Sequence, residues 1–386
     1  MRNLIAAIAL ALASVGAVAA EPIKIGLVAP YSGPQATYGP QMEAGMKAWL
    51  EIHGDTIGGR KVQIIVRDNA GPNPENAKRL SQELVTRDKV DFLAGYGFTP
   101  DAMAAAPVAT EAKVPLVVMN AASSIVTTRS PYIVRFSDTL QQVSAPMGTW
   151  AAKHGIKKVY TLVSDYAPGI DSETAFKKAF EAGGGQVMDS VRVPLRNPEF
   201  APYVQRIKDA KPDAVFMFVP SGEQGVAFMK AFEERGLAKA GIKVIATGDL
   251  TDDEVIDTMG DAVLGVITSH HYSAAHDSPE NKQFLAAYAQ VKGKLPRANF
   301  FAVGGYDGMA GIAEVVKKLD GKLDGDKAME AFKGLKMTSP RGPISIDPAT
   351  RDIVQTVYIR RVEKKGNEYW NIEFDKFPDV KDPGKP

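Results

Sequence analysis

The chain has 386 residues, of which 45% are hydrophobic and 24% are charged, a balance typical of a globular protein with more than one apolar core. It carries 46 lysine and arginine residues against 45 aspartate and glutamate residues, so no basic excess indicates nucleic-acid binding. Cysteine is absent, which excludes disulfides, thiolate metal sites and cysteine nucleophiles.

Residues 1–20 are predicted to be a signal peptide and not part of the fold. Arg2 supplies a positive charge, residues 4–18 are apolar or small, and small residues precede the charged Glu21. The apolar stretch of about 15 residues is shorter than the ~20 that a helix needs to span a bilayer. We therefore expect cleavage after Ala19 or Ala20 and a soluble mature chain in the periplasm, without a membrane anchor.

Strands and helices alternate through the first third of the mature chain. The expected strands are apolar, β-branched runs, and the expected helices carry apolar residues at a spacing of three to four. Strands are predicted at 23–29, 61–67, 92–94 and 116–119, and helices at 42–50, 74–85 and 102–112. Near-continuous apolar strands are typical of parallel sheets that are buried on both faces.

The same pattern restarts after about residue 141. Strands are predicted at 159–163, 186–193, 214–218 and 243–246, and helices at 172–182, 199–210 and 300–319. An antiparallel hairpin is expected from 356–362 and 369–374, around the turn at 364–367. The sequence thus predicts an α/β fold with two doubly wound parallel sheets.

Catalytic motifs are not recognisable in the chain, which lacks a phosphate loop, a complete dinucleotide fingerprint, a zinc-protease helix and a nucleophile elbow. A metal site is conceivable at a histidine cluster, but no further ligand follows at a regular spacing, so we favour a solvated loop there. The cluster consists of His270, His271 and His276 with Asp277. We expect no catalytic residue, no metal and no cofactor.

An acidic run at 252–254 also has two interpretations. It resembles a cation site or an acid/base pair, but Thr251 and Glu254 have the spacing of a helix capping box, and acids favour a helix N-terminus. We favour the capping box.

Ligands of open α/β sheets bind beyond the carboxyl ends of the strands. In this chain those ends carry small hydroxyl and aromatic residues, in the segments 29–38, 95–99, 120–124, 164–169, 219–222 and 247–249. Thr99 is expected to be an N-cap followed by Pro100, and its hydroxyl and the free amides there would accept a carboxylate. Capping alone explains each feature, but their convergence at one sheet edge indicates a ligand site.

The mature chain resembles the branched-chain amino acid binding proteins, which are periplasmic solute receptors of ABC importers. The resemblance rests on Ile23–Pro34 with Tyr38-Gly39, on Gly58–Val62 and on Gly342–Asp347, and it extends over about 22–375. It implies a type I periplasmic-binding clamshell, in which two lobes joined by three crossovers close on a ligand. The N-terminal lobe would combine 21–141 with 271–349, and the C-terminal lobe 142–270 with 350–386.

The resemblance also implies roles for individual residues. Tyr38 would pack over the ligand, Phe301 would form a pocket wall, and Asp249 would face an α-ammonium group. An α-carboxylate would be held by Thr99, Ala121 and Ser123.

The sequence departs from the family pattern at three points. Pro168 and Pro220 stand where tyrosines are common, Asp249 replaces the usual glutamate, and the family's small disulfide is absent. Homologues of this group also take benzoates and phenylpropanoids, so we expect an aromatic carboxylate, with an aliphatic amino acid or an amide-like solute as alternatives. Asp249 or a loop histidine would then accept a ring hydroxyl. The slot for the ring would draw on Tyr38, Tyr96, Phe98, Tyr166, Tyr272 and Phe301, with Ser221 at the neighbouring strand end.

Two other classes of function stay open. A sensor that signals to a partner would use the same clamshell, and an exported α/β enzyme would need a nucleophile or metal. We favour a monomeric receptor whose partners are a small carboxylate ligand and the permease subunits of an ABC importer.

Overall fold

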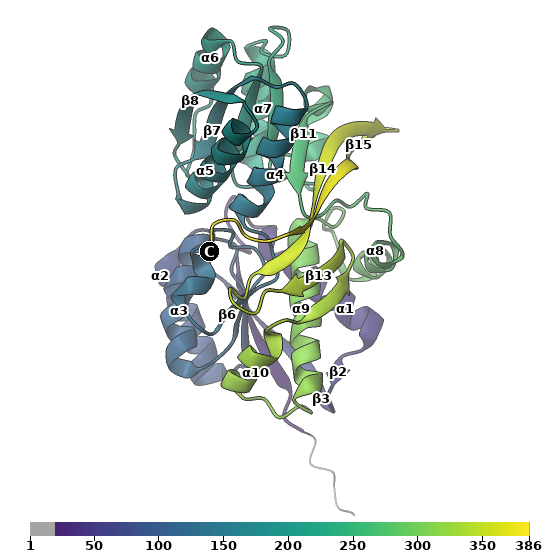
Figure 1. The fold of residues 1–386 in the computed structure, drawn as a ribbon. Helices are drawn as coiled ribbons and strands as arrows, with labels where there is room; N and C mark the ends of the chain where they lie inside the picture. Colours follow the sequence, from purple (N-terminus) through teal and green to yellow (C-terminus); the bar gives the residue numbers. More distant parts are fainter. Residues whose placement is uncertain (1–19, 386) are drawn as a thin grey trace, which may run out of the picture.

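The chain forms two α/β lobes, one above the other, in the computed structural model (Figure 1). The structure describes residues 20–385, so residues 1–19 of the predicted signal peptide lie outside this range. Within these residues no helix is long and apolar enough to cross a membrane.

The first lobe is built on a six-stranded sheet of order β2-β3-β1-β4-β5-β6. All neighbours in it are parallel except β2 and β3. The strands are β1 (Ile23–Ala29), β2 (Thr56–Ile57), β3 (Arg60–Asp68), β4 (Phe92–Gly95), β5 (Leu116–Val118) and β6 (Ile133–Arg135). The helices of the first part of the chain are α1 (Tyr38–His53), α2 (Pro74–Glu83), which continues into the π turn η1 (Leu84–Asp88), α3 (Thr99–Ala112) and the 3₁₀ turn η2 (Val126–Arg129). The order makes this sheet doubly wound, as predicted.

The second sheet runs in the order β12-β13-β14-β11-β10-β9-β7-β8, with β15 also paired to β14. Its parallel strands are β7 (Lys158–Ser164), β8 (Gln186–Val193), β9 (Ala214–Phe218), β10 (Lys243–Thr247) and β11 (Ile267–His270). The antiparallel part contains β12 (Lys336–Ser339), β13 (Gly342–Ile346), β14 (Ile353–Lys365) and β15 (Glu368–Val380). Its helices are α4 (Leu140–Lys153), α5 (Ala167–Ala182), α6 (Ala201–Ala210), α7 (Glu223–Glu234) and the 3₁₀ segment η3 (Ile256–Val263). The predicted hairpin is confirmed, and its strands are longer than expected.

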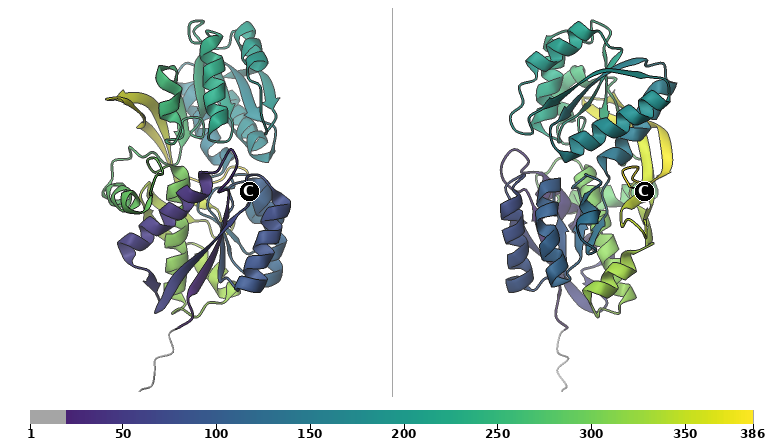
Figure 2. Two further views of the ribbon diagram at one scale, coloured as in Figure 1. Left: turned by 180° about the vertical axis from the view of Figure 1, so that it is seen from behind. Right: turned by 60° about the vertical axis from the view of Figure 1, so that its left-hand side comes forward.

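The chain passes between the lobes three times. It enters the upper lobe at α4, returns with α8 (Pro279–Val291), and leaves the lower lobe again along β14 (Figure 1). Figure 2 shows α9 (Phe300–Lys318) and α10 (Gly325–Phe332) in the lower lobe, far along the sequence from the sheet that they cover. The two-lobed α/β fold with parallel sheets is therefore confirmed.

Strands β12 and β13 complicate the lobe boundaries. They are hydrogen-bonded to the second sheet through β14, yet Ile344 and Ile346 belong to the apolar core of the first lobe. The second sheet thus extends along β14 and β13 into the first lobe. The boundaries 21–141 with 271–349 and 142–270 with 350–386 remain a prediction.

Helix α9 packs closely against α1 because glycines meet backbone there. A Cβ on Gly45 would lie 1.8 Å from the carbonyl oxygen of Ala302, and one on Gly305 would lie 2.1 Å from that of Met42. Real atoms do not approach so closely, so both positions need glycine. This contact fixes α9, whose first residues reach the space between the lobes.

Candidate functional site

A narrow cavity lies between the lobes, beyond the carboxyl ends of strands from both sheets. The centre of a water molecule can occupy about 20 Å³ of it, so its walls lie close together. The residues that line it are Tyr38, Gly97, Phe98, Thr99, Asn120, Ala122, Asp138, Leu140, Tyr166, Pro168, Phe218, Pro220, Asp249 and Phe301. Both lobes and the first crossover contribute to the lining.

Aromatic rings form two sides of this cavity. Tyr38 stacks between Phe98 and Phe301, with ring centroids 5.6 and 3.9 Å apart, respectively. In the other lobe Tyr166 stacks on Phe218 at 6.1 Å. Stacked side chains of this kind suit a flat, aromatic guest.

Two helix N-termini meet at the cavity, one from each lobe. The N-cap residues are Phe98 for α3 and Tyr166 for α5, and neither cap makes a side-chain hydrogen bond to its helix. Thr99 is the first residue of α3, so the expectation that it is the N-cap is wrong. Its hydroxyl oxygen accepts a hydrogen bond from the amide of Ser123 at 3.1 Å, which leaves the hydroxyl proton for a further acceptor. Free amides and a positive dipole end favour a negative group here.

Two carboxyl groups are the charged side chains of the lining. Burial, with a smaller contribution from the charge of Asp138, raises the pKa of Asp249 to about 7, although the Thr247 hydroxyl donates to it at 2.8 Å. Burial likewise raises the pKa of Asp138 to about 6. Both groups are therefore easier to protonate than ordinary aspartates, and each can serve as a hydrogen-bond donor or acceptor to a polar guest.

Hydrogen bonds across the cleft hold the lobes together. The hydroxyl of Tyr38 donates to the carbonyl oxygen of Ser221 at 2.8 Å. Asp171 on α5 accepts from the hydroxyl of Ser123 at 2.6 Å and from the amide of Ser124 at 3.0 Å. The structure thus represents the closed form of the two lobes.

A second, larger cavity of about 530 Å³ opens at the mouth of the cleft. Phe98 lines both cavities, and Arg196 of the second lobe reaches across this mouth to the carbonyl oxygen of Pro72 at 3.0 Å. The outer cavity therefore borders the inner one at Phe98.

Six of the residues singled out from the sequence line the inner cavity: Tyr38, Phe98, Thr99, Tyr166, Asp249 and Phe301. Ala121 and Ser123 are buried next to it, and Ser221 lines the outer cavity. Tyr272 and Tyr96 are not among the lining residues. Tyr272 donates to Asn281, and the hydroxyl of Tyr96 bonds that of Ser81, both inside the first lobe.

Asp138 and Asn120 also line the cavity. Asn120 begins the segment 120–124, one of the strand ends at which the sequence predicts a ligand site, but the sequence predicts no role for Asn120 itself. Asp138 precedes Thr139, whose capping box with Gln142 starts α4, so its local signal is that of a helix start. Only the crossover between the lobes brings it to the cavity.

The solvated loop predicted around the histidines is wrong for His270 and His271. Their exposed fractions are 1% and 0%, because β11 delivers them to the contact between the lobes. Only His276, which pairs with Glu373 at 2.7 Å, is partly exposed. Burial, followed by the charges of nearby arginines, lowers the pKa values of His270 and His271 well below the ordinary value, so both rings are neutral.

The capping box predicted for Thr251 and Glu254 is also wrong. Thr251 is buried, and its hydroxyl donates to the side chain of Asn371 at 2.7 Å. The amide of Glu254 is held instead by Asp252 at 3.1 Å, and η3 begins only at Ile256. The long hairpin β14–β15 supplies Asn371 as the partner of Thr251. The residues next to Thr251 in the sequence give no sign of this distant contact.

A protein-family model described as "Periplasmic binding protein" matches residues 22–367. A solute binding protein of an ABC transporter from Rhodopseudomonas palustris BisB5, solved in complex with 3,4-dihydroxy benzoic acid, is 57% identical, with a TM-score of 0.91 over 95% of this chain and 99% of that one. Another from R. palustris, in complex with 4-hydroxybenzoate, is 46% identical, with a TM-score of 0.92 over 94% and 99%. The "Leu/Ile/Val-binding protein homolog 6" of Brucella melitensis is 44% identical over 98% of each chain.

Proposed function

Because the chain belongs to the periplasmic binding protein family, we propose that it is a receptor that captures a hydroxylated aromatic carboxylate between its lobes and delivers it to an ABC importer. The observation that carries this proposal is the pairing of an aromatic slot with two uncapped helix N-termini and two buried carboxyl groups at one cavity. It acts by binding and release and not as an enzyme, in the periplasm and as a monomer.

The polar groups suggest how such a solute would lie. Its carboxylate would meet the N-terminus of α3 and the hydroxyl of Thr99, where amides and the helix dipole favour an anion. Its ring would stack against Tyr38 and Phe301, and a ring hydroxyl would bond Asp249. A raised pKa at Asp249 reduces repulsion between this acid and an anionic solute.

The two structures with hydroxylated benzoates support this choice of ligand class, since they are 57% and 46% identical to the chain over nearly its whole length. An aliphatic amino acid is the second candidate, favoured by the 44% identical relative that is named for leucine, isoleucine and valine. In that case Asp249 would face the α-ammonium group.

The test is isothermal titration of the ligand-stripped protein with 3,4-dihydroxybenzoate, 4-hydroxybenzoate, benzoate, leucine and valine. We expect the hydroxylated benzoates to bind most tightly and benzoate to bind less tightly, because it leaves the buried Asp249 without its hydroxyl partner. Tighter binding of leucine or valine than of any benzoate would contradict the proposal and support the second candidate.

A further inference from the structure

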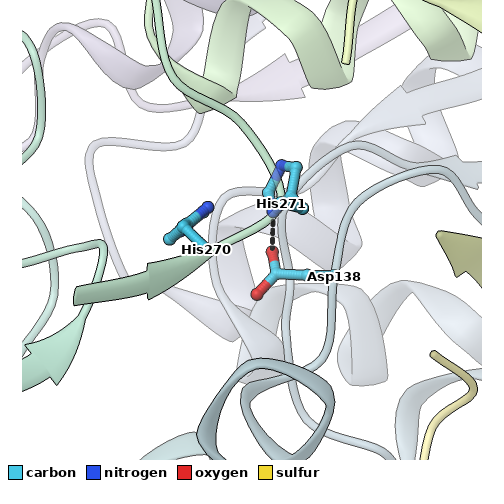
Figure 3. A group of neighbouring side chains, drawn as sticks. All are labelled: Asp138, His270 and His271. Carbon is cyan, nitrogen blue, oxygen red and sulfur yellow. Dashed lines mark ion pairs between the residues drawn. The ribbon is translucent and has the colours of Figure 1, made fainter. Parts of the chain in front are cut away.

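We propose that Asp138, His270 and His271 form a site for one divalent transition-metal ion at the hinge between the lobes. One candidate ligand atom from each of the three side chains lies within 4.8 Å of the other two, and all three residues are buried. Figure 3 shows them converging from two different crossovers, with Asp138 below His271 and His270 beside it. The site borders the proposed solute cavity, because Asp138 lines that cavity, but its test needs no solute.

The orphaned ring nitrogens are the first observation in favour of this site. Among the described residues, Nδ1 of His270 and both ring nitrogens of His271 are buried without a hydrogen-bond partner. Leaving a buried polar atom unpaired costs about 1–3 kcal/mol, so unpaired nitrogens on two neighbouring rings indicate a missing partner, to which each ring can offer one nitrogen. A neutral imidazole offers the lone pair that a metal ion takes.

The distance between the ligand atoms is the second observation. Nδ1 of His271 lies 3.3 Å from Oδ1 of Asp138, yet the geometry is not that of a hydrogen bond. Two atoms that each lie about 2.0–2.1 Å from a tetrahedral ion are about 3.3–3.4 Å apart. If the lone pairs of Nδ1 and Oδ1 both point to an ion between them, the short distance and the missing hydrogen bond are both explained.

The surroundings supply further support for His270. Its Nε2 lies 3.9 Å from Oδ2 of Asp249, so a small shift would let it donate to that carboxylate while Nδ1 binds the metal. Histidine ligands commonly hold a carboxylate or carbonyl on the second nitrogen, which fixes the ring. Asp138 and Asp249 both line the inner cavity, so the open coordination positions would face the solute.

Charge balance permits a cation here despite three buried arginines. Arg135 is paired with Asp352 at 3.3 Å. Arg341 is paired with Asp307 at 2.7 Å and so adds no net charge. Arg360 bonds the Thr268 hydroxyl and backbone carbonyls, and its charge is opposed by those of Asp253, Glu373, Asp252 and Asp249. Imidazole and carboxylate ligands suit zinc, cobalt, nickel or iron better than magnesium or calcium.

The test uses Co²⁺ alone, added to the full-length mature protein after treatment with a chelator and without any solute. We expect one equivalent to bind, with visible d–d absorption that Zn²⁺ abolishes by displacement. His271→Ala and Asp138→Asn should each weaken the binding of Co²⁺ by more than about 100-fold, a larger loss than for an outer-shell partner. The matched control is His276→Ala, which removes a histidine paired with Glu373 outside the cluster and should leave Co²⁺ binding unchanged.

NMR spectra of the histidine rings test the site in the wild-type protein, so this result does not depend on whether a variant folds. Co²⁺ should broaden or shift the ring signals of two histidines, those of His270 and His271, and leave those of His53, His154 and His276 in place. Failure of the wild-type protein to take up a stoichiometric ion would overturn the proposal, as would equal losses in His276→Ala and His271→Ala. Either outcome leaves the solute receptor intact, because solute titrations are run without metal.

Discussion

At the scale of single residues, Thr99 tests the carboxylate end of the cavity. Its hydroxyl proton is free because its oxygen accepts from Ser123, and a bond from it to a carboxylate is charge-assisted. Thr99→Val keeps the shape and removes the donor, so solute affinity should fall about 10- to 100-fold, equivalent to roughly 1.5–3 kcal/mol. Titration calorimetry measures the loss.

Two further variants control this experiment. Thr99→Ser restores the hydroxyl and should recover most of the affinity. Thr110→Val alters the same helix at a hydroxyl that bonds Ala106 and Ser130 away from the cavity, and should leave binding unchanged. Wild-type affinity in Thr99→Val would remove Thr99 from the site.

Asp249 distinguishes the two ligand classes. Asparagine keeps a hydrogen-bond acceptor of the same size, so Asp249→Asn should reduce the affinity for a hydroxybenzoate by only about 1–2 kcal/mol. An amino acid would instead leave its ammonium group unpaired in a buried cleft, at a cost of about 2–5 kcal/mol. Titration of this variant with the best ligand decides between the two ligand classes. Asp277→Asn, at an exposed position, is the control. No measurable change would mean that Asp249 does not contact the ligand.

At the scale of elements, a buried ion pair fixes α9 to the turn between β12 and β13. Asp307 accepts from Arg341 at 2.8 Å and from Ser339 at 2.9 Å, while Arg341 also donates to the carbonyl oxygen of Phe136 at 2.6 Å. Asp307→Ala leaves the guanidinium buried without its acid, which should lower the free energy of unfolding by about 3–5 kcal/mol.

Urea unfolding measures this loss. The matched control lies on the same helix, because Glu314 pairs with Lys317 at the surface. Glu314→Ala should lower the free energy of unfolding by less than about 1 kcal/mol. Equal effects of the two substitutions would show that the pair with Arg341 does not stabilise the fold.

The elements also show what the sequence could predict. The apolar runs of β9 and β5 are buried along their length, so a continuous apolar run is enough to predict these strands. The start of α5 lies five residues before the prediction, because Pro168 occupies its first turn and the apolar pattern begins later. The predictions for Thr251, His270 and His271 are wrong because the segments that bury them, β14–β15 and another crossover, are distant in the sequence. Local patterns carry no record of such distant contacts.

At the scale of the whole molecule, closure of the lobes should depend on the solute. The structure is closed, with Tyr38, Ser123 and Asp171 joining the lobes. A solute that contacts both lobes stabilises this form relative to an open one. Small-angle scattering should therefore give a smaller radius of gyration with saturating ligand than with the ligand-stripped protein. Identical profiles in the two states would count against closure on binding.

The threading of the chain also has a consequence for its synthesis. The core of the first lobe needs α9, and the second sheet needs β14 to cover the open side of β11, so both are completed by segments that the ribosome makes late. Domains of many proteins fold one after another as the chain emerges. Here a chain that has emerged as far as β11 already holds the main core of the second lobe, apart from Val362 and Tyr369, but lacks α9 and β13 for the core of the first. The lobe whose strands are made first is therefore the last to have its core completed, after nearly all of the chain has been released.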